Sequence, residues 1–124
     1  AYDPEEGSVT LALPLTPEHV GNVVRGMPHG GAIAALVDAA AGAAAALRVP
    51  TEDVPGVATI DMRVDFLAPA QGDVLLAAAA VARAGRRVVV VRTEVRDAEG
   101  TLVALGTSAF GVARAGAAGQ EGEG

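Results

Sequence analysis

A single acidic side chain interrupts a long apolar segment of the sequence. Asp38 lies in the run from Gly30 to Leu47, which otherwise contains only Ala, Gly, Ile, Leu and Val. The residues three and four positions away are all Ala or Gly, so no cation on the same helix would pair with the carboxylate. Such a carboxylate can be a general base or a nucleophile in a cleft. It can equally be a solvated Asp on the one polar stripe of a helix, and the residues alone leave both interpretations open.

Two glycines stand at the start of the same segment. In Pro28-His29-Gly30-Gly31 they would open the helix, where the first backbone N–H groups have no helical acceptor and the helix dipole is positive. Such N–H groups can stabilise an oxyanion. The alternative is a tight entry into the helix that needs Gly for its backbone conformation alone.

The spacing of these two features limits how they can act together. Asp38 follows Gly30 by 8 residues, which is about 12 Å along a helix that rises about 1.5 Å per residue. The carboxylate therefore cannot reach a carbonyl held by Gly30 of its own helix. If two subunits set these helices side by side and antiparallel, Gly30 of one would meet Asp38 of the other, and two equivalent composite sites would form.

The segments around the helix indicate strands joined by short turns. Residues 7–15 alternate apolar and other side chains as a half-buried strand does, and Pro14 places its end at a sheet edge. The helix is predicted from Gly30 to about Arg48, with further strands near 59–66, 74–83, 86–97 and 101–113. This pattern predicts an α+β fold with an antiparallel sheet wrapped around one helix, in a single domain over residues 1–113 with a flexible tail over 114–124. Because the helix is apolar on nearly every side, a second copy of the chain is expected to cover part of it.

Residues 59–66 alternate two kinds of side chain. The apolar members are expected to face the core, and they are Ile60, Met62, Val64 and Phe66. The polar members are expected to form a solvated or interface ladder on the other face, and they are Thr59, Asp61, Arg63 and Asp65.

Composition excludes several classes of function. The chain has 124 residues, 51% of them hydrophobic, and its lack of Cys excludes thiolate metal sites, Cys nucleophiles and disulfides and fits a cytoplasmic location. A net charge of −6 with 2% aromatic residues argues against a nucleic-acid partner. The run from Gly30 to Leu47 has the length of a membrane span, but its Ala and Gly content and Asp38 favour a core helix over a membrane one. Because His19 and His29 lack a helical partner four residues away, no metal site is expected.

Four segments match a known family in type and order. They are Gly26-Met27-Pro28-His29-Gly30-Gly31-Ala32, Leu36-Val37-Asp38, Thr59-Ile60-Asp61-Met62-Arg63-Val64-Asp65-Phe66-Leu67-Ala68-Pro69 and Gly100-Thr101-Leu102-Val103-Ala104. The resemblance as a whole covers roughly residues 8 to 113, and its most specific part is His-Gly-Gly followed by an acid 8 residues after its first Gly. The chain resembles the hotdog-fold acyl-CoA thioesterases, in particular their small PaaI-type branch of the phenylacetate pathway.

The resemblance implies a fold and a set of site residues. It implies a five-stranded antiparallel sheet around the central helix, no cofactor, and homodimers that join their sheets edge to edge, often as dimers of dimers. Asp38 would be the nucleophile or general base, Gly30 the donor that polarises the thioester carbonyl, and Thr59 the hydroxyl that helps to place water. Whether water or Asp38 itself attacks the carbonyl stays open. His29 and Gly31 share the glycine motif and are expected to contact the substrate.

Two further groups of residues are candidate substrate contacts. Asn22 would correspond to an Asn of the family, but it stands 7 residues before His29, one more than is usual there, so the match needs a one-residue bulge. Arg83, Arg86 and Arg87 surround a predicted turn, and the guanidinium groups of the last two suit the phosphates of CoA. A plain solvated turn is the alternative, because every cation of this chain is Arg.

Two other functions are compatible with the fold. A hotdog hydratase or dehydratase would place a His five residues after the Asp or pair a His with a Glu, and position 43 here is Ala43. A non-catalytic acyl-CoA-binding dimer would not need both Asp38 and Gly30. The expected activity is therefore hydrolysis of a small aromatic or short- to medium-chain acyl-CoA.

Overall fold

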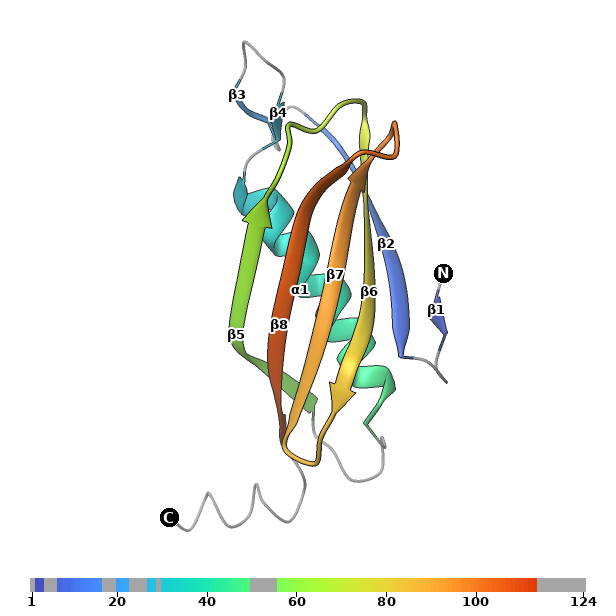
Figure 1. Ribbon diagram of the computed structural model, residues 1–124, viewed down its shortest axis with the longest axis vertical. Helices are drawn as coiled ribbons and strands as arrows, with labels where there is room; N and C mark the ends of the chain where they lie inside the picture. Colours follow the sequence, from blue (N-terminus) through green and yellow to red (C-terminus); the bar gives the residue numbers. More distant parts are fainter. Residues whose placement is uncertain are drawn as a thin grey trace.

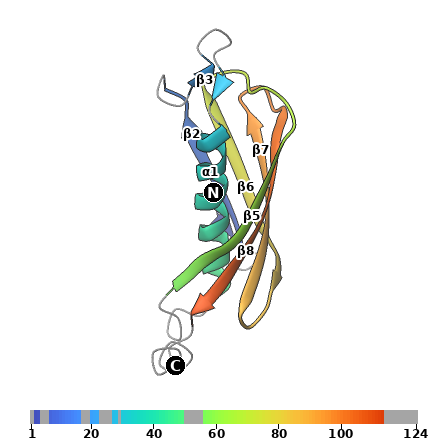
Figure 2. The ribbon, with the colours of Figure 1, turned by 90° about the vertical axis from the view of Figure 1, so that its left-hand side faces the viewer.

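A long helix lies along one face of an antiparallel sheet (Figure 1, Figure 2). The computed structural model describes residues 2–3, 7–16, 20–22, 27–28, 30–49 and 56–113. The helix, α1, spans Gly30–Leu47, close to the range that its apolar run predicts. The tail over 114–124, predicted to be flexible, lies outside the described residues.

The sheet has six strands in the order β1-β2-β6-β7-β8-β5, and all neighbours are antiparallel. The strand bounds are Tyr2–Asp3 for β1, Ser8–Pro14 for β2, Gly56–Phe66 for β5, Val74–Ala84 for β6, Val88–Asp97 for β7 and Leu102–Ala113 for β8. The five long strands confirm the predicted sheet. β1 adds only a two-residue pairing with β2, and β5 forms the opposite edge of the sheet.

The segment between β2 and the helix, predicted as a loop, contains a second small sheet. β3 (Val20–Asn22) pairs antiparallel with β4 (Met27–Pro28). Strands of three and two residues are too short to show a period in the sequence. β4 ends two residues before α1 begins, so this small sheet sets the approach of the chain to the helix.

Small side chains form most of the contact between helix and sheet. The buried helix residues are Ile33, Leu36, Val37, Ala40, Ala41, Ala44 and Ala45. Ala77 and Ala79 of β6 are buried in the same core. At Gly106 of β8 the layers are so close that a Cβ would lie 2.5 Å from Cγ1 of Val37. By length and composition alone α1 could cross a membrane, but here it packs on the sheet as the core helix.

A β-bulge in β5 changes which side chains of this strand face the core, so the prediction for Thr59 and Ile60 is wrong. The register with β8 shifts between Thr59 and Asp61, so Ile60 is the extra residue. Its side chain is 61% exposed instead of lying in the core. Because side chains alternate along a strand, the extra residue moves Thr59 from the predicted polar face to the face that meets α1. Met62 and Val64 pack against the core as predicted.

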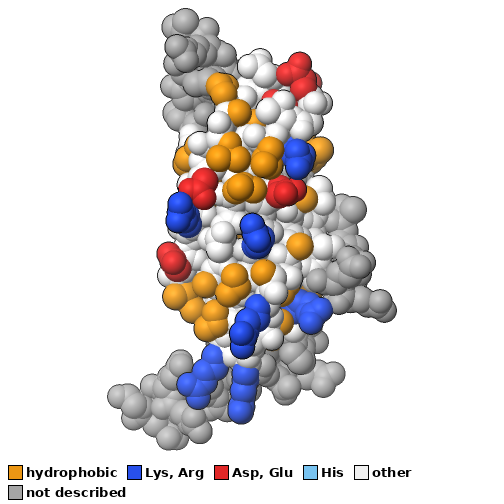
Figure 3. All heavy atoms as spheres, in the orientation of Figure 1, with side chains coloured by type: hydrophobic (Ala, Val, Ile, Leu, Met, Phe, Trp, Pro, Cys, Tyr) orange, Lys and Arg blue, Asp and Glu red, His pale blue; other side chains and the backbone are white. Residues whose placement is uncertain are grey.

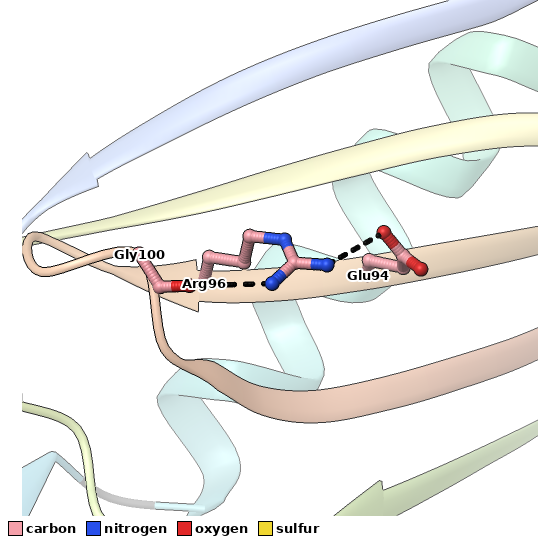
Figure 4. A network of polar contacts seen from close by, with 3 residues as sticks. All are labelled: Glu94, Arg96 and Gly100. Atoms are coloured by element: carbon pink, nitrogen blue, oxygen red, sulfur yellow. Dashed lines mark hydrogen bonds and ion pairs between the residues drawn. The ribbon is translucent and has the colours of Figure 1, made fainter.

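The face of the sheet turned away from α1 carries charged side chains among apolar ones (Figure 3). On β5, Nε of Arg63 and Oδ1 of Asp65 form an exposed ion pair at 3.1 Å. On β7, Arg96 pairs with Glu94 at 3.3 Å and donates a 3.2 Å hydrogen bond to the carbonyl of Gly100 (Figure 4). Exposed pairs of this kind add little stability. They are consistent with the solvated ladder expected for the polar face of β5.

A buried carboxylate ties two loops together at one end of the sheet. Asp97, the last residue of β7, is 2% exposed. It accepts hydrogen bonds from the backbone N–H groups of Gln71 at 2.9 Å, Glu99 at 3.0 Å and Thr101 at 2.9 Å. The bond from Gln71 is the largest cause that holds the pKa of Asp97 below its ordinary value of 3.8, although desolvation opposes it. The loop before β6 and the turn after β7 therefore share one anchor.

Candidate active site

The carboxylate of Asp38 is held from the neighbouring strand. Asp38 is half-buried on α1, and its Oδ1 accepts a 2.8 Å hydrogen bond from Oγ1 of Thr59 on β5. Thr59 reaches the helix because the bulge at Ile60 turns its side chain toward α1. The structure thus brings together two of the predicted catalytic residues, by a backbone irregularity that the sequence pattern does not show.

The start of α1 presents the two glycines to solvent. Gly30 and Gly31 are its first residues, and both are exposed. Backbone N–H groups in a first helical turn lack helical acceptors and lie at the positive end of the dipole. A Cβ built on Gly31 would meet no described atom within 4 Å, whereas one on Gly30 would lie 3.4 Å from Cζ of Phe66. Among the described residues, the helix start therefore has no neighbour at the Gly31 position and is bordered by an aromatic ring at Gly30.

The donor and the carboxylate lie at different heights of one continuous helix. Because α1 is helical from Gly30 through Asp38, the two are separated by about 12 Å along its axis. β5 follows the helix between these positions, with Thr59 beside Asp38 and Phe66 beside Gly30. One thioester carbonyl cannot touch both groups of the same chain.

Two candidate substrate contacts precede the helix. The backbone of Asn22 pairs with Met27, which places it beside the segment that enters α1. The register of this small sheet shifts between Val20 and Asn22, before Asn22 and not after it. Residues 23–26, which would have to hold the bulge that the family match needs, lie outside the described residues, and so does His29.

Arg86 and Arg87 are exposed in the turn between β6 and β7. This turn lies at the end of the sheet away from the start of α1 (Figure 1). Basic side chains gather at the same end in Figure 3. Within one chain, the structure does not bring these two residues to Asp38.

Within residues 7–16, 30–49 and 56–112, whose side chains the structure describes, no group of three His, Cys, Asp or Glu residues could hold a metal ion. The described site consists of a carboxylate, a hydroxyl and backbone donors. These groups are the ones used in acyl transfer and hydrolysis.

Comparison with protein families identifies the chain. Residues 25–104 match the Thioesterase superfamily. The chain belongs to this superfamily. The matched region contains the glycine motif, Asp38 and Thr59. The sheet with its central helix is the hotdog fold of the superfamily, and the chain is a thioester hydrolase.

Several known proteins are similar to this chain over most of its length. The medium/long-chain acyl-CoA thioesterase YigI of Escherichia coli is 34% identical over 117 residues, which are 86% of this chain and 76% of YigI. The BH2602 protein of Bacillus halodurans, crystallised with CoA, has a TM-score of 0.75 and 31% identity over 83% of this chain and 66% of its own. A phenylacetic acid degradation-related protein of Ralstonia eutropha has a TM-score of 0.80 and 29% identity over 90% of this chain and 81% of its own.

Phe66 is the site residue that sequence reasoning missed. Its alternation with neighbours predicted a core side chain, but it is 57% exposed. Its position beside Gly30 depends on how far β5 extends along the helix. The alternation of side chains within β5 does not predict that extent. Thr59 was found only through the resemblance, because its position in the alternation predicted the opposite face of the sheet.

Proposed function

We propose that the protein hydrolyses the thioester of an acyl-CoA whose acyl group is small and aromatic or a short to medium chain. The observation that carries the proposal is the Asp38 carboxylate, fixed by Thr59, on the same helix that begins with exposed glycine N–H groups. Two relatives support acyl-CoA as the class of substrate, because YigI is named a medium/long-chain acyl-CoA thioesterase and the B. halodurans protein was crystallised with CoA. The R. eutropha relative supports placement in the PaaI-type branch.

Each group has a defined part in the proposed reaction. Thr59 engages Oδ1 of Asp38, which orients the carboxylate and presents Oδ2 to the reacting atoms. Asp38 either takes a proton from water as it attacks the carbonyl carbon, or attacks that carbon itself to form an anhydride that water then opens. The N–H of Gly30 holds the carbonyl oxygen as it gains negative charge. The C–S bond breaks, and the products are a carboxylic acid and the free thiol of CoA.

The proposed catalytic unit is a homodimer joined along β5, with further pairing of dimers as its natural extension. β5 is one of the two edge strands of the six-stranded sheet. Three of the five exposed large hydrophobic residues in the described chain lie on it or directly after it, and they are Ile60, Phe66 and Leu67. Two-fold pairing of these edges would set two α1 helices antiparallel, so that Gly30 of one subunit faces Asp38 of the other.

The remaining predicted contacts complete the proposed complex. Asn22, His29 and Gly31 are proposed to contact the substrate near the helix start. Arg86 and Arg87 are proposed to bind the CoA phosphates, because guanidinium groups pair well with phosphate oxygens. We place this activity in the cytoplasm, with no cofactor and with neither nucleic acid nor membrane as a partner.

A panel of acyl-CoA substrates tests the function. Purified protein is incubated with phenylacetyl-, benzoyl-, acetyl-, hexanoyl- and octanoyl-CoA, and thiol release is followed with a thiol reagent. At least one substrate should be turned over, and Asp38→Asn should abolish most of that activity. Binding of these compounds without hydrolysis would identify an acyl-CoA-binding dimer instead. Hydration of crotonyl-CoA without thiol release would identify a hydratase.

A further inference from the structure

The two sides of the helix start differ in chemistry. On the Gly30 side, Cζ and Cε1 of the Phe66 ring lie 3.4 and 3.5 Å from the position of a Cβ. On the Gly31 side, no described atom lies within 4 Å of the corresponding position. In the single chain the Phe66 side chain is 57% exposed, so its ring has surface that a bound acyl group at the subunit boundary can cover.

An acyl-CoA bound at this helix start would also have two unlike sides. The acyl group that leaves the carbonyl carbon is apolar, whereas the CoA arm on the sulfur carries amides and phosphates. A carbonyl oxygen within hydrogen-bond distance of the Gly30 N–H brings both substituents close to the helix start. Contact with the ring removes apolar surface of the acyl group from water, which favours binding. The polar CoA arm gains little binding free energy from the same contact.

We propose that Phe66 is a specificity-determining residue that binds the acyl group, while the CoA arm leaves on the side of the helix start away from the ring. This inference rests on the proposed function. It does not depend on which subunit supplies the carboxylate, because Phe66 and Gly30 are neighbours within one chain. The chain that supplies the Gly30 N–H to a site therefore also supplies the Phe66 contact with the acyl group.

A purely structural Phe66 would have a different signature. If the ring only covered the helix start or joined two subunits, its removal would change thermal stability or dimerisation, and it would affect all substrates alike. A side chain that contacts the acyl group changes kcat/KM in proportion to the apolar surface of the substrate. The ratio of activities on long and short acyl groups separates the two roles.

The first experiment compares Phe66→Ala and Phe66→Leu on acetyl-, butanoyl-, hexanoyl-, octanoyl- and phenylacetyl-CoA. Phe66→Ala should lower kcat/KM for the larger acyl groups by about tenfold relative to acetyl-CoA, the scale expected for a lost apolar contact. Phe66→Leu keeps an apolar side chain and should retain most of the preference. Leu76→Ala is the matched control, because it also removes an exposed apolar side chain, 41% exposed, but from β6.

A second experiment places the change in one of two subunits. In a mixed dimer of Asp38→Asn and Gly30→Pro chains, the intact site would use Gly30 of the Asp38→Asn chain. Adding Phe66→Ala to that chain should reduce the preference for larger acyl groups. Adding it to the Gly30→Pro chain should leave the preference unchanged, because that Phe66 borders the disabled donor.

The outcomes separate this inference from the proposed function. If the parent hydrolyses acyl-CoAs and folded, dimeric Phe66→Ala lowers kcat/KM equally for all of them, the acyl contact is wrong and the function stands. If Phe66→Ala leaves kcat/KM unchanged for every acyl-CoA of the panel, the acyl contact is likewise wrong and the function stands. If the parent hydrolyses none of the substrates, the proposed function fails, and the inference falls with it.

Discussion

Asp38 and Thr59 are 21 residues apart in the chain and meet through one hydrogen bond. Residue types and spacing make Asp38 a candidate, because it is the one acid within an apolar helix. They do not identify its partner. Strict alternation places Thr59 with the solvated side chains of β5, and only the inserted Ile60 reverses that. A bulge depends on how the strand pairs with β8, so the sequence of β5 alone cannot predict it.

Replacement of Asp38 tests the carboxylate. Asp38→Asn and Asp38→Ala should remain folded dimers and lower kcat on a good acyl-CoA by about 100-fold or more. Thermal melting should show an equal or higher Tm, since a half-buried carboxylate is held there for function. A folded variant with near-parental kcat would contradict the assignment.

Thr59 offers a finer test, because its hydroxyl can be removed with little change of shape. Thr59→Val keeps the branched side chain but cannot donate to Oδ1, so the carboxylate loses its orientation. We expect kcat to fall about tenfold with KM nearly unchanged. Thr59→Ser keeps the hydroxyl and should keep most of the activity. If the two variants behave alike, the hydroxyl has no part in the reaction.

At the scale of elements, long strands and the helix are predictable and short ones are not. α1 and the five long strands each carry enough residues for apolar periodicity to show. β1, β3 and β4 have only two or three residues each, so their pairing depends on tertiary contacts. The anchoring role of Asp97 is equally hidden, because its partner Gln71 belongs to a different loop.

The lowered pKa of Asp97 should make the thermal stability of the protein depend on pH in the acidic range. Its pKa is lowered in the folded state, so its contribution is complete above the ordinary value of 3.8 and is lost as the pH falls through the folded-state pKa. Asp97→Asn should lower Tm by several degrees at neutral pH, because the amide is a poorer acceptor for three N–H groups. Between about pH 5 and pH 3 the parent should lose more Tm than Asp97→Asn does. Parallel curves from differential scanning calorimetry would show that Asp97 is not the titrating anchor.

At the scale of the whole molecule, the proposed site divides each chain into two half-sites, Gly30 at the start of α1 and Asp38 further along it. The separation of Gly30 from Asp38 follows from the sequence once the helix is recognised. The arrangement of a second subunit does not, because an edge strand can pair with many surfaces. The exposed apolar residues of β5 are the structural reason to expect pairing there.

Mixed dimers test the shared site. Asp38→Asn and Gly30→Pro chains should each be inactive alone, and Pro is tolerated in a first helical turn because its missing N–H has no helical acceptor. After subunit exchange of a 1:1 mixture, half of the dimers are mixed and each has one intact site. Activity should therefore recover to about a quarter of the parental value. Folded chains that exchange subunits, as mass spectrometry can show, yet stay inactive would contradict the shared site.

The arginine end of the molecule supplies a test of CoA binding. Arg86→Ala combined with Arg87→Ala should raise KM for acyl-CoA, leave kcat nearly unchanged and weaken the salt dependence of KM. Arg92→Ala, an exposed change on β7, serves as the control for altered net charge. An unchanged KM in the double variant would remove this turn from the substrate site.

The alanine-rich contact between α1 and β6 has a mechanical consequence. Alanine has no side-chain rotamers, so ordering Ala40, Ala41, Ala44 and Ala45 costs no side-chain conformational entropy. These four residues also have no alternative rotamers through which this part of the helix could repack on the sheet. We therefore expect α1 to move against the sheet, where it moves at all, as a rigid body. Such a displacement would move Gly30 and Asp38 of one chain together and keep the distance of about 12 Å between them along the helix.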